Sequence, residues 1–327
     1  MSQKKERVLW ADMCKGLLIT LLMFSHLVWI SKGQSINNSV IGHISDYSGI
    51  WDCFFMSCFF LMSGMFSNFN KEGKIFLWGN FKSLIIPALI SQVILCLPSL
   101  NWSFFLKTTF LYGGGLWFLS SLFLSKLFFW ACIKLIKRDW IVIALLLVLS
   151  FAGKWLDDLN LFPNYWYHRN FLNFCLYLGV GYYFKDYIIK KTVGVISTVA
   201  FVLTIAAILV IGVRIPNVVA VFNESLAQHP LTIWLSITGS IACIHLCKLI
   251  AHSVVLEFLG RNSLIVYIYH MFLLPRFISA LSLSLKGGAL VDSVLMVFMI
   301  VVSILVFCSG LAAVIDTKYL RWMKGVF

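Results

Sequence analysis

The sequence predicts an all-α, polytopic integral membrane protein with about ten transmembrane helices, and three observations predict this fold class. Of the 327 residues, 61% are hydrophobic and only 12% are charged, which leaves too few polar side chains to cover a soluble domain of this length. The apolar residues are gathered in runs of roughly 17–25, the length that crosses a bilayer. Aromatic residues make up 16% of the chain, with 12 Trp, and this suits aromatic belts at two membrane interfaces.

Ten apolar runs are candidates for membrane spans, and the second, fifth and sixth are short. They cover residues 10–30, 49–67, 82–100, 115–135, 139–154, 170–185, 193–213, 230–250, 263–283 and 289–314. The gaps between them hold no linker, low-complexity tract or convincing repeat. Residues 1–327 are therefore expected to form a single membrane-embedded domain.

The basic residues predict the orientation of these helices. Eighteen Lys and Arg fall on one side of the alternating spans and seven on the other, while Lys126 lies within a span. The positive-inside rule places the richer side, which holds both termini, in the cytoplasm. We therefore expect a multi-pass protein of the inner (cytoplasmic) cell membrane. The net charge of +13 is divided among short gaps, so it does not predict a nucleic-acid-binding face.

The nine cysteines predict buried free thiols, because nearly all lie inside apolar runs and none form a C-x-x-C pair. The tightest group in the sequence is Cys243, His245 and Cys247. On a helix His245 points away from the two cysteines, so no metal site is expected.

The first span carries three ionisable residues on one face. At 100° per residue, Asp12, Lys15 and His26 share a stripe, with Lys15 and His26 about 16 Å apart along the axis. Ionisable side chains cost several kcal/mol in hydrocarbon, so the stripe should face protein or a water-filled cavity. Lys15 would then lie near the cytoplasmic surface and His26 deep in the membrane, where a long ligand could reach it.

Two segments carry a resemblance to a known family. The first reads Trp10-Ala-Asp12-Met-Cys-Lys15-Gly16 and is followed by His26; the other is LEFLGRNSLIVYIYHMFLL, residues 256–274. Together with Phe-rich and Trp-containing segments between them, they resemble the integral-membrane acyltransferase 3 family, and most closely its fucose 4-O-acetylase-like branch. Many members of the family have Arg where this chain has Lys15, which keeps the charge but loses the bidentate guanidinium.

The resemblance implies a membrane O-acetyltransferase that moves an acetyl group from cytoplasmic acetyl-CoA to a sugar hydroxyl. The acceptor would be a cell-surface polysaccharide or its lipid-linked precursor, and no metal would be required. His26 would be the general base or would carry the acyl group, with Lys15 and Asp12 as its catalytic partners. A histidine that packs between helices, a topology-setting lysine and a structural aspartate are the simpler interpretations.

Further residues are expected to bind the two substrates. The cations expected at the phosphates of acetyl-CoA are Lys15, Lys71, Lys74, Lys82 and Arg261. The residues expected at the acceptor are Arg169, Trp166, Trp117, Tyr267 and His270. Ordinary cytoplasmic charges and an interfacial aromatic belt are the simpler interpretations of these two sets. Lys126 should face the interior of the helix bundle, but the sequence assigns it no role.

A function from another class stays open on the sequence alone. A polytopic transporter or flippase of glycan intermediates would also hold charges in a cavity within the membrane. The sequence does not separate acetyl from other acyl donors, and it does not name the sugar. A homo-oligomer is compatible with it.

Overall fold

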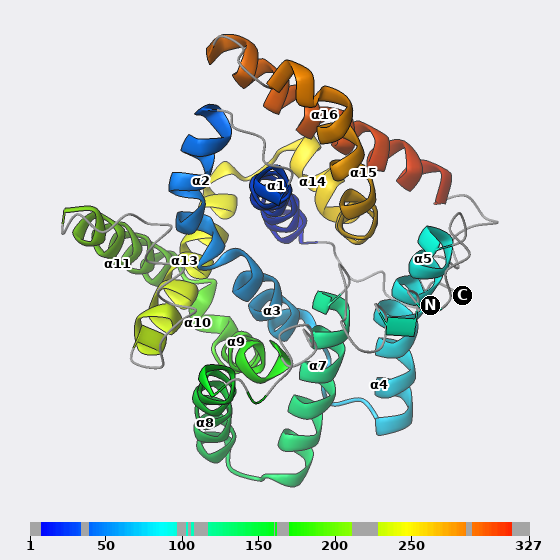
Figure 1. The fold of residues 1–327 in the computed structure, drawn as a ribbon. Helices are drawn as coiled ribbons and strands as arrows, with labels where there is room; N and C mark the ends of the chain where they lie inside the picture. Colours follow the sequence, from blue (N-terminus) through cyan, green and yellow to red (C-terminus); the bar gives the residue numbers. More distant parts are fainter. Residues whose placement is uncertain are drawn as a thin grey trace.

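The computed structural model confirms the all-helical fold class (Figure 1). It describes residues 8–33, 39–96, 103, 106–107, 117–159, 161, 170–210, 228–285 and 290–315. In chain order the helices are α1 (Leu9–Gly33), α2 (Ser39–Asp52), α3 (Phe55–Phe66), α4 (Gly73–Asn80), α5 (Ile86–Cys96), α7 (Trp117–Leu135), α8 (Asp139–Asp158), α9 (Phe171–Tyr183), α10 (Lys185–Ile188), α11 (Lys191–Val210), α13 (His229–Ile250), α14 (Val254–Arg261), α15 (Ser263–Leu285) and α16 (Leu290–Ile315). A π-helical turn, Phe81–Ile85, joins α4 to α5.

Seven segments of the described chain are helical, long and apolar enough to cross a membrane. They are Leu9–Gly33, Ile41–Phe66, Trp117–Leu135, Asp139–Asp158, Lys191–Val210, His229–Ile250 and Val297–Val314. Each matches one of the ten expected spans. The other three expected spans coincide with α5, α9 and α15, so helices are present there, while the total of ten and the cytoplasmic termini stay predictions.

The second span begins earlier than expected and is interrupted. Its candidate segment starts at Ile41 instead of residue 49, and it consists of α2 followed by α3. The helical pattern breaks at Cys53 and Phe54, directly after Asp52. The expected span began at residue 49 because most of α2 is polar, although α2 and α3 belong to one candidate span.

Helix α1 lies in the middle of the molecule and contacts α2, α3, α13, α14 and α15 (Figure 1). Its closest partner is the short helix α14, and two glycines allow the approach. A methyl group added at Gly16 would overlap the backbone carbonyl of Leu256, and one added at Gly260 would overlap the carbonyl of Asp12. The two segments that carried the family resemblance therefore meet backbone to backbone in one helix crossing, a contact that only small residues permit.

Reciprocal hydrogen bonds define the start of α14. The Ser253 hydroxyl accepts a hydrogen bond from the backbone N–H of Leu256 at 3.4 Å, and the Ser253 N–H donates to Glu257 Oε1 at 3.2 Å. His252 Nδ1 lies 2.5 Å from the same carboxylate oxygen. This arrangement resembles a capping box and fixes where the chain turns into the helix that supports α1.

Large apolar side chains on the outer helices point away from the protein. On α11 these include Ile196, Val202 and Leu203, and on α16 they include Phe298 and Val306, all more than half exposed. Soluble proteins rarely expose apolar surface on this scale. The same surface in contact with lipid tails is stable, so the fold is that of a multi-pass membrane protein.

Candidate active site

His26 and His270 form a direct side-chain pair in the interior of the bundle. Nδ1 of His26, on α1, lies 2.6 Å from Nε2 of His270, on α15. The ring planes differ by only 2°, with centroids 4.9 Å apart. His270 is completely buried, whereas the exposure of His26 is intermediate. The sequence marked both residues separately, and the fold brings them together.

The hydrogen bonds around this pair define one arrangement of protons. Nδ1 of His270 lies 3.0 Å from the carbonyl oxygen of Val266, which can only accept, so this nitrogen carries the proton. Nε2 of neutral His270 is then an acceptor, and His26 Nδ1–H donates to it. In this tautomer Nε2 of His26 holds a free lone pair. Among the described residues none forms a hydrogen bond with that nitrogen, so it is available as a base.

Tyr267 lies one helical turn before His270 and forms the next layer of the site. Its hydroxyl accepts a hydrogen bond from the backbone N–H of Phe118 at 3.3 Å, and its ring centroid is 5.9 Å from that of His270. Trp117 begins α7 and packs against Phe174 at 5.9 Å. Tyr267 is therefore tied to α7 beside the histidine pair, whereas the ring contacts of Trp117 are with Phe118 and Phe174.

Asp52 is a half-buried polar residue near this site that was not predicted from the sequence. Its carboxylate accepts a hydrogen bond from the Ser25 hydroxyl at 2.5 Å, and Trp51 Nε1 donates to the same hydroxyl at 2.8 Å. Ser25 directly precedes His26, so this network holds α1 beside the break between α2 and α3. The signal in the sequence was an acid within an otherwise apolar stretch, WDCFF, where a charge is costly.

A cavity of about 350 Å³ runs along the same face of α1. From α1 it is lined by Lys15, Ile19 and Leu22, so it stops about one helical turn short of His26. From α7 it is lined by Phe118, Leu122 and Lys126, and from α15 by Tyr267. Of the stripe predicted from the sequence, Lys15 therefore faces this cavity, while His26 lies beyond its end against His270.

A second cavity of about 240 Å³ adjoins the first, since Ser67 and Ser83 line both. Lys71 lines this second cavity. The other expected donor-binding cations do not line either cavity: Lys74 is exposed on α4, Lys82 lies over the ring of Trp78 at 5.1 Å, and Arg261 donates from Nε to the carbonyl of Glu257 at 3.2 Å. The geometry therefore favours Lys15 and Lys71 among the predicted cations.

Lys15 and Asp12 form the expected ion pair between positions i and i+3. The distance from Nζ to Oδ1 is 3.4 Å, and the Asp12 side chain is almost fully buried while that of Lys15 is 38% exposed. Asp12 also belongs to the turn that contacts Gly260. The position of Asp12 therefore favours a role in holding Lys15 over a direct role in catalysis. Arg169 and Trp166, expected at the acceptor, lie outside the described residues.

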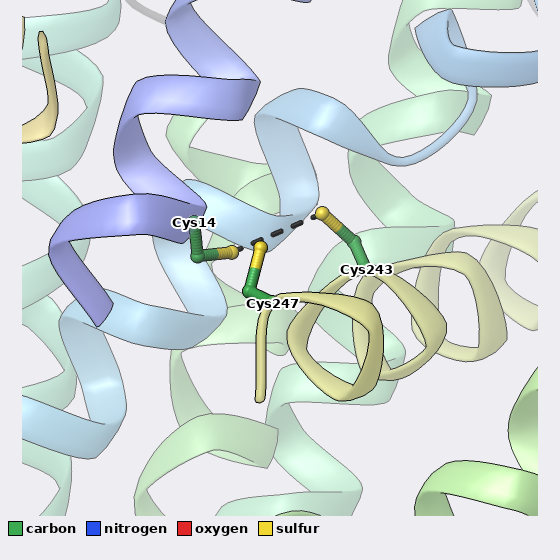
Figure 2. A group of neighbouring side chains, drawn as sticks. All are labelled: Cys14, Cys243 and Cys247. Carbon is green, nitrogen blue, oxygen red and sulfur yellow. Dashed lines mark hydrogen bonds between the residues drawn. The ribbon is translucent and has the colours of Figure 1, made fainter. Parts of the chain in front are cut away.

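Four cysteines meet where α1, α3 and α13 pack together. Cys14 Sγ lies 3.8 Å from Cys243 Sγ and 4.0 Å from Cys58 Sγ, and all are buried. Figure 2 shows Cys14, Cys243 and Cys247 pointing toward one another, and their sulfurs lie within 4.8 Å of each other. His245, as expected, points elsewhere, since its ring abuts Gly194 on α11. The sequence did not show that Cys14 and Cys58 would join this group.

The fold and the site define a multi-pass membrane protein with a histidine pair beside an apolar cavity that carries lysines. The chain belongs to the acyltransferase 3 family, because the model of that family, described as an acyltransferase domain, matches residues 8–313. Neither curated proteins nor solved structures gave a significant match. The match supports a transferase that moves an acyl group, in agreement with the resemblance seen in the sequence.

Proposed function

We propose that this protein is an O-acetyltransferase of the fucose 4-O-acetylase-like branch. It transfers an acetyl group from cytoplasmic acetyl-CoA to a sugar hydroxyl of a cell-surface polysaccharide or its lipid-linked precursor. The observation that carries the proposal is the His26–His270 pair, which leaves His26 Nε2 free to act as a base. Acyl transfer to a hydroxyl needs such a base at the point where donor and acceptor meet.

The reaction follows from that geometry. His26 Nε2 takes the proton of the sugar hydroxyl as its oxygen forms a bond with the thioester carbonyl carbon. The tetrahedral intermediate collapses as the carbon–sulfur bond breaks, and the imidazolium returns its proton to the sulfur, so free CoA and the acetyl ester leave. His270 accepts the Nδ1–H of His26 throughout and stabilises the charged imidazolium. It is therefore assigned to positioning His26, in place of the acceptor-binding role expected from the sequence.

The adjoining cavities support the proposed path of the donor. The phosphates and adenosine would lie toward Lys15 and Lys71, and the pantetheine arm would follow the apolar section past Leu22 and Tyr267. The thioester would then extend toward His26 while the phosphates stay at the lysine end of the cavity. The acceptor would approach from the opposite face, so that only the acetyl group crosses.

The test uses the purified full-length protein in liposomes, with labelled acetyl-CoA and extracted surface glycan. His26→Ala should abolish transfer of the label. His43→Ala, which removes an exposed histidine of α2, should leave it unchanged. Lys15→Ala should weaken acetyl-CoA binding about tenfold, the cost of one charge-assisted hydrogen bond, whereas Lys15→Arg should retain most of the affinity. Transfer by His26→Ala at the wild-type rate would exclude the mechanism.

The same preparation separates this function from transport. A transporter or flippase would move a glycan intermediate without acetyl-CoA, and acetyl-CoA would not raise its thermal stability. An acetyl-imidazole adduct on the peptide that contains His26, found by mass spectrometry without acceptor, would instead favour a covalent step at the same residue. Acetylation of an acceptor confined to the face opposite acetyl-CoA would support the two-sided arrangement.

A further inference from the structure

We propose that Lys126 is a phosphate-binding residue, and that it and Lys15 together bind the pyrophosphate of the acyl-CoA donor. This inference rests on the proposed function and adds a residue from a different helix to the donor site. Lys126 is on α7, in the middle of a membrane span, and it lines the same cavity as Lys15 on α1.

The charges of the cavity require a compensating anion. Lys15 is already paired with Asp12 at 3.4 Å, so this pair adds little net charge. Lys126 has no hydrogen bond or ion pair with any residue that the structure describes. An ammonium group at the middle of a membrane span is costly, and a phosphate group bound beside it would offset that cost.

Both lysines lie at the same end of the cavity. Along α7 the lining residues run from Phe118 through Leu122 to Lys126, and along α1 they run from Leu22 through Ile19 to Lys15. The cations are thus separated from Phe118 and Leu22 by an apolar section of about 10–12 Å, at 1.5 Å of rise per residue. This order, cations followed by an apolar section, matches acyl-CoA, whose charged pyrophosphate is followed by the narrow pantetheine arm.

Binding of CoA to the detergent-purified full chain tests the assignment. Lys126→Met should weaken CoA binding about tenfold or more, because one charge-assisted contact is lost. Pantetheine, which lacks the phosphates, should bind wild type and Lys126→Met equally. Lys126→Arg should restore CoA affinity. Lys134→Met, which removes an exposed lysine from the end of the same helix, is the matched control and should bind CoA as wild type does.

The outcomes distinguish this inference from the proposed function. If wild type and Lys126→Met bind CoA with equal affinity, the inference is overturned and the proposed function still stands. If Lys126→Met loses as much affinity for pantetheine as for CoA, Lys126 does not act on the phosphates, and the inference is also overturned. Wild type that does not bind CoA, but binds a polyprenyl pyrophosphate through Lys126, would overturn the donor assignment itself. Lys126→Met should fold, as judged by gel filtration, because it replaces a charge within a membrane span with an apolar side chain.

Discussion

His26 Nδ1 and His270 Nε2 are 2.6 Å apart, although the two residues are separated by 244 positions in the chain. The contact joins the first helix to α15, and the carbonyl of Val266 determines which nitrogen of each ring carries its proton. One imidazole is therefore oriented by another, and the outer nitrogen of His26 remains basic.

Replacement of His270 should impair catalysis more than binding. His270→Ala removes the acceptor that orients His26, so kcat should fall about tenfold to a hundredfold, part of the roughly 10²–10⁴ that a general base contributes. The KM for acetyl-CoA should change little. His270→Gln, whose side-chain oxygen can accept from His26 Nδ1–H, should recover part of the loss. Steady-state kinetics would show this; a change in KM alone would contradict the positioning role.

A methyl group at the crossing of α1 and α14 should destabilise the protein. Gly260→Ala places Cβ against the carbonyl of Asp12, so the helices must separate, at an expected cost of about 1–3 kcal/mol. Gly310→Ala is the control, because nothing lies within 4 Å of its added Cβ. It should be neutral or slightly stabilising, since alanine favours a helix. Thermal unfolding in detergent measures both, and equal midpoints would contradict the tight crossing.

The expected orientation can be tested by labelling single cysteines in a thiol-free variant. Leu161→Cys and Lys190→Cys replace exposed residues after α8 and before α11. An impermeant maleimide added to intact cells should label position 161 only. Position 190 should react only after the membrane is opened. The reverse pattern would place the termini outside and remove acetyl-CoA from reach of Lys15.

The cysteine group at Cys14, Cys58, Cys243 and Cys247 is expected to act as packed thiols. Three or four thiolates would carry a large uncompensated charge within the bundle, whereas neutral thiols at 3.8–4.0 Å are in ordinary contact. Purified protein should therefore hold no stoichiometric zinc or copper by elemental analysis. Cys243→Ala should preserve activity. One metal ion per chain, lost together with activity in Cys243→Ala, would establish a metal site instead.

Much of the fold could be predicted because its physical causes are local. Apolar runs of membrane length indicated the helices, and the helical repeat alone placed Asp12, Lys15 and His26 on one face. The start of α2 could not be predicted in this way. Its polar side chains resemble a loop, and only packing against α1 and α3 shows it to be helical.

The site was less predictable because its contacts join distant segments. The sequence suggested a role for both His26 and His270, but no periodicity indicates that one ring would lie against the other. Lys126 was recognised as an unusual charge, yet its place beside Lys15 depends on how α7 is rotated about its axis. Asp52 was missed because its partner, Ser25, belongs to another helix.

The position of α1 at the centre of the bundle has a consequence for biogenesis. Helix α1 is made before the other helices that the structure describes, whereas His270, which contacts His26, follows that residue by 244 positions, and Gly260, which packs against α1, belongs to the same late segment. Until then its charged stripe lacks its final neighbours, and nascent helices or the insertion machinery must shield it from lipid. The His26–His270 contact can therefore form only after α15 has been made.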